Sequence, residues 1–493
     1  MPCTTILVGK NATYDGSTMM ARNEDSPSGS FTPKKWIVMN PKDQPRHYQS
    51  VLTKFHMDLA EEPLRYTAMP NALTNEGFWG EAGINEANVA MSETETITSN
   101  DRVLGADPLV KDGIGEEDML LLVLPYIRSA REGVKRLGKL LETYGTCELN
   151  GVGFQDKEEI WWFESIGGHP LVGERGDPGM YHHWMAKRVP DDAYVVMPNQ
   201  LGIDTLDLAD ALGERKNYMC SSDLADFISE NHLDLSMTKE GPFDSRSAFG
   251  SRSDSDHTYN TPRAWYMLSY FNPHAFLPGG PLSSMTPESD DLPWSYVPEK
   301  KIAVDDVKYV LSSHYQGTPY DCYGGKGDEH SRNRYRPIGI NRNNFLALTQ
   351  LRPYMPPERM AVEWLAVSCN VFNSFIPFYA NVTKTPSYIS ETGKIPDSQQ
   401  FYWAIRFISA LADSHFGSTS SSIERYIAAT SNRACALLAA SDKAPVEGDI
   451  HSFLESCNEK MAAMAKEETN KCLDQVLYTA SLEMKNSFAR SDS

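Results

Sequence analysis

The sequence has no long hydrophobic run and no excess of basic side chains. No stretch approaches 18 consecutive apolar residues, so we expect no membrane-spanning helix. The 46 Lys and Arg residues are outnumbered by 66 Asp and Glu, which gives a formal net charge of -20. Binding to nucleic acid needs clustered basic side chains, so this charge balance excludes a nucleic-acid partner. We attribute the negative charge to solubility.

Paired cysteines are also missing. The eight cysteines are scattered without the spacing of a disulfide framework or a zinc site, and no His-Glu-x-x-His motif occurs. The segment from Met1 to Thr5 lacks the basic and apolar regions of a signal peptide. These features predict reduced thiols, a cytoplasmic location, no metal and no cofactor.

What the chain does have is length and a succession of hairpin patterns. Its 493 residues predict either one large domain with an appendage or two domains. A polar segment, 245–256, is interpreted as a surface loop. Strand patterns that form hairpins are predicted for segments 4–21, 83–98, 150–164 and 184–197. Helical periodicity is present in segments 116–141, 206–212, 221–231 and 399–493. Strands that arrive in hairpins indicate an α+β protein with antiparallel sheets and helices outside them.

The first hairpin carries the candidate chemistry. Cys3 opens the first strand, and the returning strand ends in Arg22-Asn23-Glu24-Asp25. Pairing of the two strands is expected to bring Arg22 and Asp25 within reach of Cys3. A guanidinium favours the thiolate form of a thiol whose ordinary pKa is about 8.5, and a carboxylate can hold an α-amino group. The α-amino group of Cys3 can then serve as the base, so that no histidine is required.

Further segments in a fixed order identify a family. They are Gly16-Ser17-Thr18, Gly83-Ile84-Asn85-Glu86, Val89-Ala90-Met91-Ser92-Glu93-Thr94, Trp184-Met185-Ala186, Arg188-Val189-Pro190-Asp191-Asp192, Pro198-Asn199-Gln200, Tyr259-Asn260-Thr261-Pro262-Arg263-Ala264-Trp265, His314-Tyr315-Gln316-Gly317-Thr318 and Arg336-Pro337-Ile338. Together with the first hairpin they resemble the cysteine branch of the N-terminal-nucleophile hydrolases. That branch includes bile-salt hydrolases, penicillin V acylases, a dipeptidase family of lactic acid bacteria and the secernins. The match extends over most of the chain.

The resemblance implies a fold and a set of roles. The fold is a four-layer αββα sandwich over residues 1–398, with residues 399–493 as a C-terminal helical extension packed on it. Cys3 is the nucleophile, with Arg22 and Asp25 as its immediate partners. Asp25 orients the terminal amine.

Three further positions acquire roles from the same resemblance. Asn199 matches an asparagine of the oxyanion hole, and a side-chain amide suits that task. Arg263 matches an arginine near the nucleophile. Glu93 lies where the acylases contribute oxyanion-hole groups, and our hypothesis is that its carboxylate receives the free ammonium of a dipeptide.

The implied activity is hydrolysis of the amide bond of short peptides, above all dipeptides, through an acyl-enzyme. Two alternatives use the same sequence features: an amidase of N-acyl substrates with the same nucleophile, and a secernin-like regulatory protein without peptidase activity. The expected partner is a small amide substrate, and relatives are often homo-oligomers. The mechanism requires that Met1-Pro2 be removed, for which autolysis of the Pro2–Cys3 bond is a candidate route.

Overall fold

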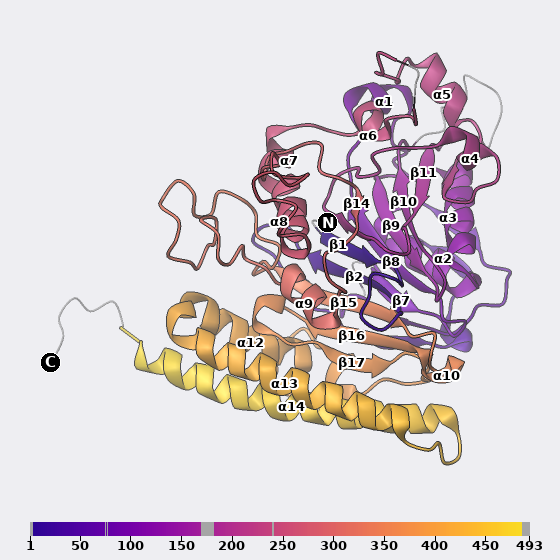
Figure 1. Cartoon of the computed structure of the whole chain (residues 1–493). Coiled ribbons are helices and arrows are strands. Elements are labelled where there is room, and N and C mark those ends of the chain that lie inside the picture. The colour runs from indigo at the N-terminus through magenta and orange to yellow at the C-terminus, as the bar shows by residue number, and fades with distance from the viewer. Residues whose placement is uncertain (1–2, 74, 76, 169–181, 239–240, 486–493) are drawn as a thin grey trace.

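The computed structural model describes residues 3–73, 75, 77–168, 182–238 and 241–485. Two antiparallel sheets dominate it (Figure 1). The seven-stranded sheet has the order β14 (Ser295–Tyr296), β12 (Tyr194–Met197), β1 (Cys3–Val8), β2 (Thr18–Asp25), β15 (Asn343–Leu351), β16 (Ala361–Val367) and β17 (Ile376–Tyr379). The six-stranded sheet has the order β13 (Tyr218–Cys220), β11 (Trp184–Arg188), β10 (Ile160–Ser165), β9 (Asn150–Gln155), β8 (Ala90–Thr96) and β7 (Ala82–Ile84). Two small ribbons pair β3 (Ile37–Met39) with β6 (Tyr66–Ala68) and β4 (His47–Gln49) with β5 (His56–Asp58).

The two large sheets lie face to face. Side chains alternate between the faces of a strand, so Leu7 of β1 and Met20 of β2 point toward the six-stranded sheet and share a core with it. A side chain at Gly153 of β9 would begin only 2.4 Å from the sulfur of Met20. Glycine at this position therefore allows the close approach of the two sheets.

Helices cover the outer faces of both sheets (Figure 1). The helical segments before residue 260 are η1 (Pro41–Asp43), α1 (Asp101–Ala106), α2 (Glu116–Val123), η3 (Leu124–Tyr126), α3 (Ala130–Tyr144), α4 (Leu208–Leu212), α5 (Leu224–Glu230), α6 (Ser245–Phe249) and α7 (Asp254–Tyr259). Those after it are α8 (Thr261–Phe271), α9 (Val304–Leu311), α10 (Pro357–Met360), η4 (Asn370–Phe372), α11 (Ser387–Ser390), α12 (Phe401–Ser414), α13 (Phe416–Lys443) and α14 (Ile450–Leu482). Helices α2 and α3 share a core with the outer face of β9 and β10, whereas α8 and α9 pack on β1 and β2.

The C-terminal helices α12–α14 lie beside β16 and β17 (Figure 1) and share a core with these strands. This arrangement confirms the mixed α and β composition, the antiparallel sheets and the helical C-terminal region that the sequence predicts. None of the helices among the described residues combines the length and the apolarity needed to cross a membrane.

One segment was predicted wrongly. The interpretation of 245–256 as a surface loop fails because α6 and the start of α7 fall within it. Asp244 caps α6 by accepting a hydrogen bond from the backbone nitrogen of Ser247, and Ser253 with Asp256 forms a capping box for α7. Serine and aspartate at these positions are helix starts, although the same residues in bulk are typical of loops.

Candidate active site

Cys3 and Arg22 lie on the inner face of the seven-stranded sheet. In the β1–β2 ladder Cys3 is opposite Glu24 and Thr5 is opposite Arg22, so these four side chains share the face that looks toward the second sheet. Arg22 reaches diagonally across the ladder, and its Nη2 donates a hydrogen bond to the Cys3 Sγ at 2.8 Å. Both side chains are buried. A guanidinium at this distance stabilises the thiolate relative to the thiol.

Buried carboxylates hold the guanidinium of Arg22 in place. Its Nη1 donates to the carboxylate of Glu81, and its Nη2 is 3.3 Å from the Oε1 of Glu116. The ammonium of Lys34 is 3.7 Å from Glu81 and 2.6 Å from Glu24. Burial, followed by repulsion from Glu81, raises the pKa of Glu24 to about 7. The charge that faces the thiol is thus part of a connected network and not a single ion pair.

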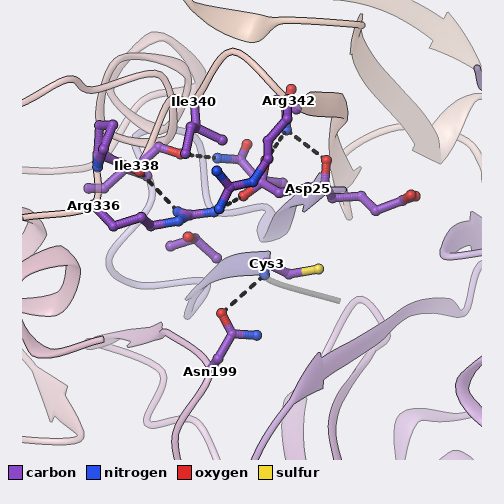
Figure 2. Close-up of polar contacts among 12 residues, drawn as sticks. Cys3, Asp25, Asn199, Arg336, Ile338, Ile340 and Arg342 are labelled. Carbon is purple, nitrogen blue, oxygen red and sulfur yellow. Dashed lines mark hydrogen bonds and ion pairs between the residues drawn. The ribbon is translucent and has the colours of Figure 1, made fainter. Parts of the chain in front are cut away.

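Asn199 and Arg263 contact the backbone of Cys3. The backbone nitrogen of Cys3 donates to the Oδ1 of Asn199 at 3.1 Å (Figure 2). The Nη2 of Arg263 donates to the same oxygen at 2.8 Å, and its Nη1 donates to the carbonyl oxygen of Cys3 and, at 2.6 Å, to the Oγ1 of Thr4. Asn199 reaches this place because β12, which ends two residues earlier, pairs directly with β1. Four of the predicted site residues, Cys3, Arg22, Asn199 and Arg263, are therefore brought together.

Asp25 has other partners. Residues 22 and 25 are an odd number of positions apart in β2, so their side chains point to opposite faces. The carboxylate of Asp25 forms an ion pair with Arg336 and accepts a hydrogen bond from the Nδ2 of Asn343 at 2.9 Å. In Figure 2 Asp25 and Arg336 lie on the side of Cys3 opposite to Asn199. The guanidinium groups of Arg336 and Arg263 each lie 5.1 Å from the ring of Tyr259, which connects Asp25 to the rest of the site.

Glu93 belongs to an irregular part of β8. The register of the β8–β9 ladder shifts between Ser92 and Glu95, where β8 has one residue more than its partner. Such bulges re-aim side chains and are common beside active sites. The side chain of Glu93 is outside the described part of the structure, so its proposed contact with the substrate stays a prediction.

The carboxylates around Arg22 are not predicted from the sequence. Glu116 is the first of three consecutive acidic residues at the start of α2. Acidic residues in the first turn of a helix are usually explained by the helix dipole. In Glu116 that explanation conceals a second role, which is to hold the guanidinium of Arg22. Burial of the whole run, from Glu116 to Asp118, distinguishes it from an ordinary helix start, and burial is visible only in the structure.

His314 does not take part in these contacts. Its Nδ1 lies 2.7 Å from the Oδ1 of Asp321 and its ring packs edge-on against Phe416. Together with Cys322 these two residues form the group of potential metal ligands that the described residues contain, with ligand atoms within 4.8 Å of one another. The hydrogen bond between His314 and Asp321 accounts for the closest pair of this group.

A buried thiol that accepts a hydrogen bond from a guanidinium, with an amide and a second arginine on its backbone, defines a nucleophilic cysteine site. Comparison with known proteins agrees with this class. A family model described as Peptidase family C69 matches residues 2–429. The chain belongs to peptidase family C69.

Individual relatives are similar over most or all of their length. A protein of Bifidobacterium longum named "Dipeptidase" is 51% identical over 545 aligned positions that cover 100% of both chains. A protein of Streptococcus pyogenes serotype M3 named "Probable dipeptidase A" is 50% identical, again over 100% of both chains. "Dipeptidase A" of Lactobacillus helveticus is 46% identical over 84% of this chain and 82% of its own length.

Proposed function

We propose that this protein hydrolyses dipeptides and that Cys3 is its nucleophile. Membership of peptidase family C69 and full-length similarity to proteins named dipeptidase support the activity. The observation that carries the assignment to Cys3 is the contact of its Sγ with Arg22. A thiolate is the reactive form of cysteine, and Arg22 favours it without a histidine.

The proposed reaction has two steps. The Cys3 thiolate attacks the carbonyl carbon of the peptide bond, and the side-chain amide of Asn199 stabilises the oxyanion. The α-amino group of Cys3 donates a proton to the leaving amine as the carbon–nitrogen bond breaks. A water molecule, deprotonated by the same amino group, then attacks the thioester, releases the first amino acid and returns the thiol. Arg263 positions Asn199 and the Cys3 carbonyl.

This chemistry requires a free amine on Cys3. We therefore propose that the Pro2–Cys3 bond is cleaved in the active enzyme. The Cys3 thiol attacks the carbonyl carbon of Pro2, the carbon–nitrogen bond breaks to free the α-amino group, and water hydrolyses the resulting thioester, which releases Met1-Pro2 and returns the thiol. Two stacked antiparallel sheets between helices support the αββα fold of the N-terminal-nucleophile hydrolases for this chain. We assign residues 1–398 to the catalytic unit and 399–493 to a C-terminal extension. We propose that Asp25 orients the terminal amine through a chain of contacts, from Arg336 to the Tyr259 ring and on to Arg263.

We also propose a cellular compartment and an oligomeric state for the enzyme. All eight cysteines are free thiols in the structure, and this supports a reducing compartment, the cytoplasm. We propose a homo-oligomer on the basis of the resemblance alone, and size-exclusion chromatography with light scattering tests it.

An amidase of N-acyl substrates would use the same residues. The names of the relatives favour dipeptides, and they also favour a peptidase over a regulatory protein. The experiment is a panel of free dipeptides and their N-acetyl forms, assayed by release of amino acids. We expect cleavage of the free dipeptides and at least a hundredfold lower kcat/KM for the blocked ones. Equal or preferred cleavage of the N-acetyl forms would overturn the dipeptidase assignment.

A further inference from the structure

A cavity that contains none of the catalytic residues lies between α9 and the C-terminal helix α13. Its volume is about 480 Å³, within the range of about 300–1,000 Å³ that is typical of small-molecule sites. Helix α9 packs on the outer face of β1 and β2, whereas Cys3 and Arg22 lie on the inner face of the same sheet. The seven-stranded sheet therefore separates this cavity from the nucleophile.

One side of α9 supplies the cavity with polar groups. Asp305, Lys308 and Ser312 line it at intervals of three and four residues, so they follow one another along one side of the helix. The ammonium of Lys308 donates to the carbonyl oxygen of Asn370 at 3.0 Å, which leaves two of its three N–H donors. The described residues place no carboxylate within ion-pair distance of this ammonium. Burial lowers the pKa of Lys308 to about 8, so a bound anion would stabilise its charged form.

Ser312 adds an independent observation. The residue is only 8% exposed, and its Oγ has no hydrogen-bond partner among the residues that the structure describes. Its backbone nitrogen donates to the carbonyl oxygen of Lys308 at 3.1 Å, which places Ser312 one turn beyond the ammonium. A buried hydroxyl without a partner is costly, and a ligand that accepts its proton removes that cost. Lys308 and Ser312 together thus provide a positive charge and a hydroxyl donor for a carboxylate.

The wall opposite α9 is largely apolar. Phe416, Ile423 and Ile427 of α13 line it, and Val371 of η4 adds a fourth apolar side chain. Glu424 lines the same wall, and its carboxylate forms no ion pair with another described residue. A second carboxylate, that of Asp305, faces the cavity from α9, so a purely anionic ligand would be repelled from two sides.

We propose that this cavity binds a free α-amino acid with an apolar side chain. Its carboxylate lies against Lys308 and Ser312, its ammonium against Asp305, and its side chain against Ile423 and Ile427. The two charges of an α-amino acid are borne by groups on one carbon atom, so they require opposite charges that are close neighbours. Asp305 and Lys308, one helical turn apart, meet this requirement. Such amino acids are products of dipeptide hydrolysis, so the choice of ligand rests on the proposed function.

Isothermal titration calorimetry of the full-length enzyme with leucine tests the site. Leucinamide lacks the carboxylate and isocaproate lacks the amine, and we expect each to bind at least about tenfold more weakly than leucine, since each loses a charged contact. The first variant is Lys308→Gln, which keeps a donor for the carbonyl oxygen of Asn370 and removes the charge. It should weaken leucine about tenfold and leave the affinity for leucinamide within about twofold.

The second variant, Ala428→Trp, fills the cavity from α13. It should abolish leucine binding and leave kcat/KM for alanyl-leucine within about twofold of the wild type, because the cavity is remote from Cys3. Ala429→Trp is the matched control, since Ala429 is the next, exposed residue of α13 and does not line the cavity. Thermal unfolding checks that both tryptophan variants are folded. If Ala428→Trp is not, the comparison of leucine with leucinamide in Lys308→Gln decides alone.

Leucine binding that is unchanged in Lys308→Gln would place the amino acid elsewhere, such as at the active site, and would overturn the inference. Absence of binding to the wild type at about 10 mM leucine would also overturn it. Equal binding of leucine and leucinamide to the wild type would contradict the role of Lys308 and Ser312. Leucine binding that is lost in Lys308→Gln, in an enzyme that cleaves no dipeptide, would instead refute the proposed function and support the site.

Discussion

The Nη2 of Arg22 donates a hydrogen bond to the Sγ of Cys3 although the two residues are not opposite each other in the β1–β2 ladder. Arg22 is opposite Thr5, and its long side chain reaches the diagonal neighbour on the same face. The contact therefore depends on the register of one hairpin and on the carboxylates of Glu81 and Glu116 that hold the guanidinium. Nucleophile and activating charge come from the first 25 residues.

Replacement of Cys3 by Ala is expected to abolish turnover of dipeptides, by at least about a thousandfold in kcat, because the nucleophile is lost. The fold should persist, since alanine occupies the same strand position with a smaller side chain. Circular dichroism and thermal unfolding check the fold, and amino-acid release checks the activity. Cys435→Ala, which changes an exposed thiol on α13, is the control and should retain full activity. Substantial activity in the Cys3 variant would refute the nucleophile.

Arg22→Lys keeps a positive charge between Glu81 and Glu116 but loses the planar fork that reaches the thiol. We expect kcat/KM to fall about 10- to 100-fold, the value of a charged hydrogen bond. The rate of alkylation of Cys3 by iodoacetamide should reach its half-maximum at higher pH than in the wild type. Arg352→Lys, at another buried arginine that binds Asp442, is the control. An alkylation profile that does not move would show that Arg22 does not activate the thiol.

Asn199→Asp separates the two uses of this side chain. The aspartate keeps an oxygen for the backbone nitrogen of Cys3 and for Arg263. It loses the amide, which donates to the carbonyl oxygen of Thr96 at 3.1 Å and is proposed to donate to the oxyanion as well. Loss of an oxyanion-hole donor lowers kcat about 10²- to 10³-fold with little change in KM. Steady-state kinetics on one dipeptide measure both values. A variant with nearly normal kcat would assign Asn199 to positioning alone.

Glu363 predicts a pH dependence of stability. Burial raises its pKa in the folded state from 4.5 to about 7. Between these values the folded protein keeps a proton that the unfolded chain releases, so the free energy of unfolding falls as pH rises from 4.5 to 7. Glu363→Gln should flatten this decline by up to about 3 kcal/mol, measured by urea unfolding at both ends of the range. Glu230→Gln, at an exposed position, should follow the wild type, and an equal slope in the Glu363 variant would contradict the raised pKa.

The sequence was sufficient where local pattern decides structure. The hairpin of β1 and β2 was predicted from the strand patterns of residues 4–21, and the proximity of Cys3 and Arg22 followed from it. The sequence was insufficient where the face of a strand to which a side chain points had to be predicted. Arg22 and Asp25 were both placed next to Cys3, and the alternation of side chains along β2 puts them on opposite faces, so that Arg22 shares the face of the thiol and Asp25 does not.

Packing between segments far apart in the chain was the other feature that the sequence could not predict. Trp161 and Trp162 are adjacent in β10 and therefore point to opposite faces, yet both are buried, because β10 is covered by α3 on one face and by the seven-stranded sheet on the other. The two strands predicted around Pro190 are present, but β11 and β12 belong to different sheets. Because the chain passes from one sheet to the other between β11 and β12, Asn199 lies next to Cys3. The family resemblance indicated this proximity, and the local sequence did not. The acidic run that begins at Glu116 looked like an ordinary helix start, and Glu81 carried no local signal.

The central claim is that the α-amino group of Cys3 is free in the active enzyme. Intact-protein mass spectrometry of purified enzyme, before and after inactivation by iodoacetamide, tests it most directly. We predict a mass lower by Met1 and Pro2, a carbamidomethyl group on the N-terminal cysteine in addition to any on the exposed Cys435, and loss of activity in proportion to labelling of the N-terminal cysteine. A fully active enzyme that retains Met1 and Pro2 would contradict the mechanism.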